Sequence, residues 1–144
     1  MVQRFDFLVI SSSIAGMSFA LKVANKGKVA LVCKTNLEEA NTYFAQGGIA
    51  SVTNLIVDNF DKHIEDTMVA GDWLSDRSAI KKVVHNAPQQ IKELISWGVN
   101  FDKDEKGNFD LHREGGHSEF RILHHKDISR DGTTRGRPLW KRWC

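Results

Sequence analysis

The sequence predicts an α/β fold that begins with a parallel β-α-β unit. Residues 7–10 form a short apolar run that includes two β-branched residues, which is typical of a strand buried in a parallel sheet. A segment of small residues, 11–16, leads directly from this run into an apolar pattern with helical spacing. A second apolar run at residues 29–33 completes a unit of the length expected for a dinucleotide-binding crossover.

The helix predicted between the two runs has one apolar face and a glycine beyond its end. The face comprises Ile14, Met17, Leu21 and Ala24. We expect Gly27 to terminate the helix as a C′ residue with positive φ. The N-terminus of this helix would direct free N–H groups and the positive end of the helix dipole at a phosphate group.

The turn before this helix lacks two of the three glycines of a G-x-G-x-x-G fingerprint. Ser11 and Ser13 occupy the first two positions, and Gly16 occupies the third. If Ser11 had to adopt a conformation reserved for glycine, the cost would be roughly 1–3 kcal/mol. The side chain of Ser13 would fill space that a phosphate needs. The segment alone is therefore compatible with a nucleotide site and also with a β-α-β unit that binds no ligand.

The composition is that of a globular protein with a single hydrophobic core. The chain has 144 residues, of which 41% are hydrophobic and 26% are charged, and its formal net charge is +2. No run approaches the roughly 18 apolar residues of a membrane span, and the N-terminus has no secretory pattern, so we expect a cytoplasmic protein without a membrane partner. The two cysteines form neither a disulfide framework nor a C-x-x-C pair, and we expect Cys33 to be a buried small hydrophobic residue.

The sequence pattern of residues 60–111 predicts two helices and a β-hairpin, which we interpret as structural scaffold. One helical stripe of apolar residues lies within residues 60–71. A second stripe comprises Ile80, Val83, Val84 and Ala87, followed by Ile91, Leu94 and Ile95. We expect Pro88 to break or restart this second helix. Turn-forming residues at 104–108 predict a β-hairpin over residues 99–111.

A glycine-containing loop follows the second predicted strand. It spans residues 41–52 and includes the adjacent Gly47 and Gly48. Paired glycines allow backbone groups to approach a ligand closely, and threonine and glutamine side chains supply hydrogen bonds to phosphate, ribose or a heteroaromatic ring. Physical chemistry alone leaves two interpretations open, namely a ligand-contacting loop or a simple connection into a strand.

Five ordered segments of the chain carry more specific motifs. They are Asn-Thr-Tyr-Phe-Ala-Gln-Gly-Gly-Ile-Ala at 41–50, His-Ile-Glu-Asp-Thr-Met-Val-Ala-Gly at 63–71, Ser-Trp-Gly-Val-Asn-Phe-Asp at 96–102, His-Arg-Glu-Gly-Gly-His-Ser at 112–118 and Arg-Ile-Leu-His-His-Lys-Asp at 121–127. Together they resemble the L-aspartate oxidase family, which belongs with the flavoprotein subunits of succinate dehydrogenase and fumarate reductase. The resemblance implies a Rossmann-like FAD-binding β-α-β core, incomplete in this chain, followed by the start of a capping region.

The resemblance assigns cofactor and substrate roles to particular residues. The FAD-binding positions are Ser12, Ser13, Ile14, Ala15, Gly16, Lys34, Asn41, Thr42, Tyr43, Phe44, Ala45, Gln46, Gly47 and Gly48. The first group matches the diphosphate segment, Lys34 the residue beside the adenosine ribose, and 41–48 the loop around the flavin. Glu114 matches a residue that helps to recognise an amino-dicarboxylate. Asn41 stands where the dehydrogenases and fumarate reductases bond a histidine covalently to the flavin, so the resemblance implies non-covalent FAD.

The reaction that the resemblance implies is the oxidation of L-aspartate to iminosuccinate, a step toward quinolinate and NAD. L-aspartate is then the substrate, and quinolinate synthase is a partner by family analogy. The family's catalytic base matches no residue of this chain, so we assign none as catalytic. We expect weak or absent FAD binding and no turnover by the chain alone. Another fumarate reductase or succinate dehydrogenase-type flavoprotein fragment is the alternative within this class.

Six histidines raise the question of a metal site, which we do not expect. No pair of them has the helical i, i+4 spacing or the cysteine partners of a zinc site. We expect His117 to form hydrogen bonds near flavin or substrate. His124 and His125 are equally compatible with structural roles.

The C-terminal segment has a different composition from the rest of the chain. From Arg130 to Cys144 it contains five basic residues and one acidic residue, with interleaved tryptophans. We therefore divide the chain into residues 1–128, the N-terminal part of an FAD-binding oxidoreductase domain, and residues 129–144, a divergent basic tail. Such a tail can bind nucleic acid in a non-catalytic fragment. We favour instead a disordered tail without function and expect no nucleic-acid partner.

Overall fold

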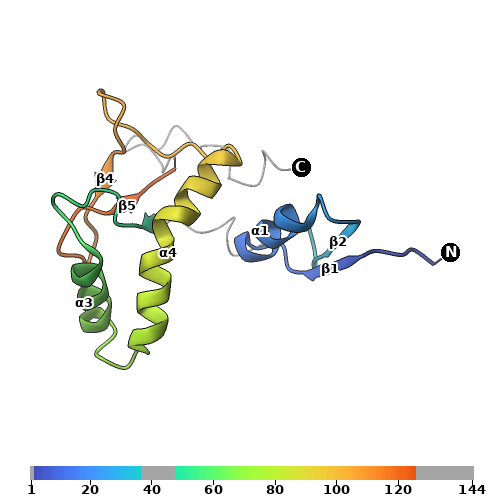
Figure 1. Cartoon of the computed structure of the whole chain (residues 1–144), viewed down its shortest axis with the longest axis horizontal. Coiled ribbons are helices and arrows are strands. Elements are labelled where there is room, and N and C mark those ends of the chain that lie inside the picture. Colours follow the sequence, from blue (N-terminus) through green and yellow to red (C-terminus); the bar gives the residue numbers. More distant parts are fainter. Residues whose placement is uncertain (1, 37–47, 126–144) are drawn as a thin grey trace. The chain divides into compact units, whose positions relative to one another are not determined.

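The computed structural model describes residues 2–36 and 48–125, and the chain divides into two compact units (Figure 1). Of the described residues, 2–36 belong to the first unit and 48–125 to the second. Each unit combines helix with strand, which agrees with the predicted α/β class. The predicted boundary between residues 128 and 129 lies outside the described residues.

The first unit contains the parallel β-α-β crossover that the sequence predicts. Strand β1 (Phe7–Ile10) pairs in parallel with β2 (Val29–Val32), so that Ile10 lies opposite Val32. Helix α1 (Ile14–Val23) connects the two strands and packs against both. The crossover returns the chain across the sheet, and the carboxyl ends of both strands therefore lie at the same edge.

Helix α1 ends differently from the prediction. Its C-cap is Ala24 in the right-handed conformation, and Gly27 does not adopt positive φ. A Cβ atom on Gly27 would lie 2.6 Å from the Oδ2 atom of Asp6, and this same oxygen accepts a hydrogen bond from the backbone N–H of Lys28. Gly27 is therefore required by the close approach of Asp6 and not by a left-handed turn.

The first unit is more exposed than predicted. In β1, which was expected to be buried, Leu8 is 64% and Ile10 is 77% exposed. Leu21 was expected on the buried face of α1 but is 38% exposed. The buried residues of this helix are Gly16, Met17 and Val23. Cys33 lies one residue beyond β2, is only half-buried, and donates a hydrogen bond from its thiol to the carbonyl oxygen of Thr35.

The second unit is built around two helices that pack against each other, α3 (Phe60–Ala70) and α4 (Arg77–Ser96). Each helix is capped, because the side chains of Asn59 and Asp76 accept hydrogen bonds from backbone N–H groups of the first turn. The core between them comprises Ile64, Met68 and Val84, with Phe60 and Ile80 packed against it. Among the described residues, no helix is long and apolar enough to cross a membrane.

Pro88 lies inside α4, so the prediction that it breaks this helix is wrong. The helix continues from Arg77 to Ser96 (Figure 1). A proline in a helix interior costs about 3 kcal/mol, because it removes one backbone hydrogen bond and clashes with the preceding turn. Burial of Val84, Ile91 and Leu94 on the same helix offsets this cost, since each contributes roughly 1.5–3 kcal/mol. Val83, also expected in the core, is 69% exposed.

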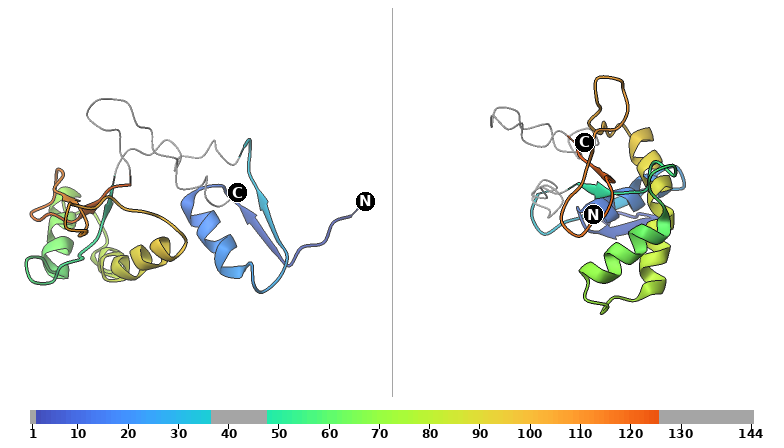
Figure 2. Two further views of the ribbon diagram at one scale, coloured as in Figure 1. Left: turned by 90° about the horizontal axis from the view of Figure 1, so that it is seen from above. Right: turned by 90° about the vertical axis from the view of Figure 1, so that its left-hand side faces the viewer.

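A small antiparallel sheet lies beside α3 (Figure 2). Its strands are β3 (Ile49–Ala50), β4 (Leu111–His112) and β5 (Ile122–Leu123), and β5 is the central strand. Because the strands are only two residues long, few backbone hydrogen bonds hold them together. Side-chain contacts to α3 therefore contribute to the position of this sheet.

The hairpin predicted over residues 99–111 is confirmed at its turn. Lys103 pairs with Phe109 in an antiparallel bridge, and Gly107 at the turn has a φ of 84°. The base of the hairpin differs from the prediction, because Leu111 pairs with Leu123 of β5 and not with the opposite arm.

Candidate functional site

The turn before α1 and the segment after β2 meet at one edge of the first unit. Because Ile10 pairs with Val32, residues 11–13 and Lys34 leave the sheet at the same edge. Helix α1 begins there after Ser13, whose side chain makes no capping hydrogen bond. The structure thus brings the predicted residues Ser12, Ser13, Ile14, Ala15, Gly16 and Lys34 to one edge. A helix N-terminus with a cation at the same edge suits a diphosphate group.

The two serines of this turn are accommodated without left-handed backbone. Ser11 does not adopt positive φ, so the predicted strain at this position is absent. The Oγ atom of Ser11 accepts a hydrogen bond of 3.1 Å from the backbone N–H of Ser13 and lies 2.9 Å from the Ser13 Oγ atom. A Cβ atom on Gly16 would lie 2.6 Å from the Ser11 Cβ atom, so only glycine allows the helix to pack this close to the strand end.

Most of the predicted flavin loop, Asn41 through Gly47, lies outside the described residues. Its last member, Gly48, precedes β3 and lies against β5. A Cβ atom at this position would overlap the side chain of Ile122 and would lie 3.0 Å from the Nε2 atom of His124. Gly48 is therefore a position of close backbone approach, as the paired glycines suggested.

Glu114, the predicted substrate residue, lies in the loop between β4 and β5. Its Oε1 atom is 2.9 Å from the Nε2 atom of His124, and its side chain is 49% exposed. The imidazole rings of His124 and His112 meet edge to face, with centroids 4.7 Å apart. The structure therefore places Glu114 among histidines at the end of the small sheet.

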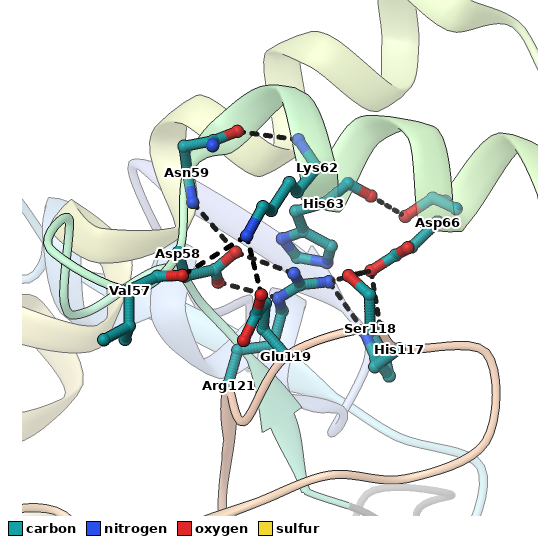
Figure 3. A network of polar contacts seen from close by, with 11 residues as sticks. Val57, Asp58, Asn59, Lys62, His63, Asp66, His117, Ser118, Glu119 and Arg121 are labelled. Atoms are coloured by element: carbon teal, nitrogen blue, oxygen red, sulfur yellow. Dashed lines mark hydrogen bonds and ion pairs between the residues drawn. The ribbon is translucent and has the colours of Figure 1, made fainter.

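A buried ion-pair network connects this loop to α3 (Figure 3). The guanidinium of Arg121 is fully buried and donates two hydrogen bonds to the carboxylate of Asp58, at 2.8 and 2.7 Å. It donates a third to Asp66. The Nδ1 atom of His117 lies 3.3 Å from the same guanidinium. Burial opposes the charge of Arg121, but the two carboxylates outweigh it and raise the pKa of the guanidinium.

The turn that follows Glu114 is fixed to α3 by two contacts. Asp66 accepts hydrogen bonds of 2.8 Å from both the backbone N–H and the hydroxyl of Ser118. Gly116 has a φ of 82°, and a Cβ atom there would lie 3.3 Å from the Cβ atom of Ala70. Burial tends to raise the pKa of the Asp66 carboxyl, but the hydrogen bonds from Ser118 and Arg121 lower it. Asp66 is therefore a carboxylate that holds this turn.

His63 is a buried neutral histidine beside the network. Burial is the main cause that lowers its pKa to about 4, and the positive charge of Arg121 and the neighbouring His117 lower it further. The rings of His63 and His117 lie 5.5 Å apart. In the described part of the chain, the Nδ1 atom of His63 has no hydrogen-bond partner.

Asp58, Asp66 and Arg121 have no role in the sequence-based prediction, although all three belong to this site. Arg121 begins an apolar run, Arg-Ile-Leu, and a charge in that position is a signal for a buried cation that needs carboxylate partners. The partners themselves could not be chosen, because they lie 63 and 55 residues away in the chain.

The histidines do not gather into a metal site in residues 2–36 and 48–125, where no group of three suitable side chains could hold an ion. His117 contacts the Arg121 guanidinium, and the Nδ1 atom of His125 contacts the carbonyl oxygen of Asn100. Both contacts are of the kind that structural side chains make.

The first unit is an α/β arrangement in which a helix N-terminus stands at the carboxyl edge of a parallel β-α-β crossover, and such an edge suits a phosphate group. The sequence matches the family described as FAD binding domain over residues 6–142. The chain belongs to this family, and its cofactor is FAD.

Curated relatives narrow the family further. The chain is 46% identical over 125 residues to "L-aspartate oxidase 2-b, chloroplastic" from Nicotiana tabacum, an alignment that covers 87% of the chain and 19% of the relative. It is 41% identical over 126 residues to L-aspartate oxidase from Acinetobacter baylyi, which covers 88% of the chain and 23% of the relative. These matches confirm the predicted resemblance. The chain spans about a fifth of the length of these relatives.

Solved flavoprotein structures share the fold. Mycobacterium smegmatis Sdh1 in complex with UQ1 matches with a TM-score of 0.77 and 28% identity, over 85% of this chain and 21% of that chain. A variant of E. coli quinol fumarate reductase FrdA matches with a TM-score of 0.75 and 29% identity, over 83% of this chain and 21% of that chain. The predicted relation to this wider flavoprotein group is therefore confirmed.

Proposed function

We propose that the chain is the N-terminal, FAD-binding part of an FAD-dependent L-aspartate oxidase. The observation that carries this proposal is the 46% identity over 125 residues to a plant L-aspartate oxidase, an alignment too long to fall within one unit. Identity to the matched dehydrogenase and fumarate reductase structures is 28% and 29%. Sequence similarity therefore favours the oxidase over the alternative flavoproteins.

The first unit supplies a Rossmann-like site for the FAD diphosphate in this proposal. The residues from Ser12 to Gly16 hold the diphosphate, chiefly through backbone N–H groups at the N-terminus of α1. Lys34 lies beside the adenosine ribose. Two features support this assignment: no side chain caps α1, and Gly16 provides the close helix–strand packing that the third glycine of the fingerprint provides.

The second unit begins with the end of the loop that contacts the flavin, Asn41 to Gly48. Asn41 cannot form the covalent linkage that a histidine forms, so FAD is held non-covalently. The close approach of Gly48 to β5 supports a loop whose backbone is tightly placed. We retain residues 1–128 as the oxidoreductase part and 129–144 as a separate basic tail.

When bound, FAD supplies the hydride acceptor that converts L-aspartate to iminosuccinate. Glu114 binds and orients the substrate, because its half-exposed carboxylate can accept a hydrogen bond from the substrate ammonium group. No residue of this chain is assigned as the catalytic base. The product then passes toward quinolinate and NAD, with quinolinate synthase as the partner enzyme.

The test is flavin retention by the purified chain. The chain is incubated with FAD and desalted, and its visible flavin absorbance is measured beside that of a Ser11→Gly/Ser13→Gly variant. We expect weak retention by the unchanged chain and stronger retention by the double variant, because the two hydroxymethyl groups leave the diphosphate turn.

A third variant, Gly16→Ala in the double-variant background, is the matched negative control. Its added Cβ would lie 2.9 Å from the backbone oxygen of residue 11, a contact that remains after Ser11→Gly, so the helix N-terminus should shift and retention should fall. Gly115→Ala is the neutral control, because nothing lies within 4 Å of a Cβ atom there. Absence of flavin from all of these proteins would contradict FAD binding by this chain.

A further inference from the structure

We propose that His124 is a positioning residue that holds the carboxylate of Glu114 ready for the ammonium group of an amino-dicarboxylate. The inference rests on the proposed function, which gives Glu114 its role in substrate recognition. It adds a residue that the resemblance left without a role and identifies what orients Glu114.

In the pair of His124 and Glu114, the imidazole is largely buried and the carboxylate is half exposed. The Nε2 atom of His124 lies 2.9 Å from the Oε1 atom of Glu114, and the two side chains are 11% and 49% exposed. The largely buried imidazole therefore lies within ion-pair distance of one carboxylate oxygen. A carboxylate has about four acceptor positions, so the exposed part of Glu114 can still accept from a ligand.

His124 is itself held on several sides. Its carbonyl oxygen accepts a hydrogen bond of 2.9 Å from the backbone N–H of Asp102, directly after β5. Its ring packs edge to face on His112, and Asp110 lies 3.7 Å from the Nε2 atom of that second histidine. Glu114, by contrast, lies in a loop. A fixed imidazole that contacts a loop carboxylate reduces the conformational entropy that the carboxylate would lose on binding.

Gly48 connects this pair to the predicted flavin loop. A Cβ atom at Gly48 would lie 3.0 Å from the Nε2 atom of His124, which is the atom that faces Glu114. Gly48, the last predicted residue of the flavin loop, and Glu114 therefore both lie near the same imidazole nitrogen. Two motifs that are far apart in the sequence converge there, which is the arrangement that places substrate beside cofactor.

The first arm of the test is spectroscopic and needs no ligand. The ring Cε1–Hε1 cross-peak of His124 is recorded by NMR on the full chain and assigned by its loss in His124→Gln. We expect Glu114→Gln to move this cross-peak. Glu119→Gln, in the same loop but paired with Lys62, should leave it in place. An unmoved cross-peak in Glu114→Gln, or equal shifts in both variants, would overturn the proposal.

The second arm measures L-aspartate binding by titration of the same chain. We expect His124→Ala to weaken binding about tenfold, which corresponds to about 1.4 kcal/mol. His124→Gln should recover most of the affinity, because its polar amide can still lie beside the Glu114 carboxylate. Succinate, which lacks the ammonium group, should respond much less to either variant. Equal losses for alanine and glutamine, or for both ligands, would refute the positioning role.

The two arms separate this inference from the proposed function. If the unchanged chain binds no L-aspartate while Glu114→Gln still moves the His124 cross-peak, the substrate role of Glu114 in this chain is refuted and the contact itself stands. If L-aspartate binds but the cross-peak is unmoved, His124 is refuted as its positioning residue and the proposed function stands.

Discussion

Replacing Arg121 by methionine should destabilise the second unit by about 3–5 kcal/mol, because it leaves buried carboxylates without their cation. Arg121 is fully buried, and the side chain of Asp58 is 2% exposed. Methionine fills part of the same volume, so the expected loss comes mainly from the missing charge and hydrogen bonds and less from a cavity.

The magnitude follows from the hydrogen bonds in the network. Arg121 donates two bonds to Asp58 and one to Asp66, and hydrogen bonds to charged groups contribute about 1.5–3 kcal/mol each. The loss is smaller than three full bonds, because both carboxylates keep other donors. Asp66 retains Ser118, and Asp58 retains the backbone N–H of Asn59.

The assay is urea unfolding of the full chain, followed by circular dichroism. Lys62→Met is the matched control, because it removes an exposed ion pair with Glu119 and should cost less than about 1 kcal/mol. If the methionine variant does not fold, Arg121→Lys retains the charge but loses the two-pronged contact and should show an intermediate loss. A loss for Arg121→Met no greater than that for Lys62→Met would refute the reasoning.

Three further predictions concern single positions, each measured by urea unfolding of the chain. The pKa of His63 is about 4 in the folded state and 6.5 ordinarily, so the unfolded state takes up the proton first as the pH falls. The free energy of unfolding should therefore fall by about 1–3 kcal/mol between pH 6.5 and 4. His63→Gln should remove this pH dependence, and an unchanged slope of unfolding free energy against pH would contradict it. Gly16→Ala should cost about 1–3 kcal/mol through its clash with the strand end, whereas Gly115→Ala should cost nothing measurable, and equal effects would contradict the packing argument. Pro88→Ala should stabilise the chain by about 1–3 kcal/mol, because alanine restores a helix hydrogen bond; destabilisation would show that the proline is better accommodated than inferred.

Local sequence patterns predicted the structure correctly where it depends on residues close together in the sequence. The apolar runs and the helical spacing between them predicted the β1-α1-β2 unit, and the turn residues predicted the reversal at Gly107. The same local rules failed at Pro88 and Gly27. At Pro88 burial along α4 outweighs helix propensity, and at Gly27 the constraint comes from Asp6, more than twenty residues earlier.

Residues of the candidate site could be predicted from the sequence only where they lie within a recognisable motif. Glu114 was predicted from its motif, but its contact with His124 was not, because that contact depends on how β4 and β5 align. Asp58 and Asp66 were missed for a similar reason. A carboxylate just before a helix, like Asp58, or within one, like Asp66, looks like an exposed residue until the fold brings Arg121 against it.

The bonds from Ser118 to Asp66 have an evolutionary consequence. They join the motif at residues 63–71 to the motif at 112–118, and Arg121 shares the same carboxylate. A substitution at Asp66 therefore leaves three donor groups, on two residues, without this acceptor, so a lineage that changes Asp66 should change Ser118 or Arg121 as well. Asp66, Ser118 and Arg121 should therefore change together in evolution. A chimera that inserts the Glu114 loop into another flavoprotein must also include helix α3, which carries Asp66.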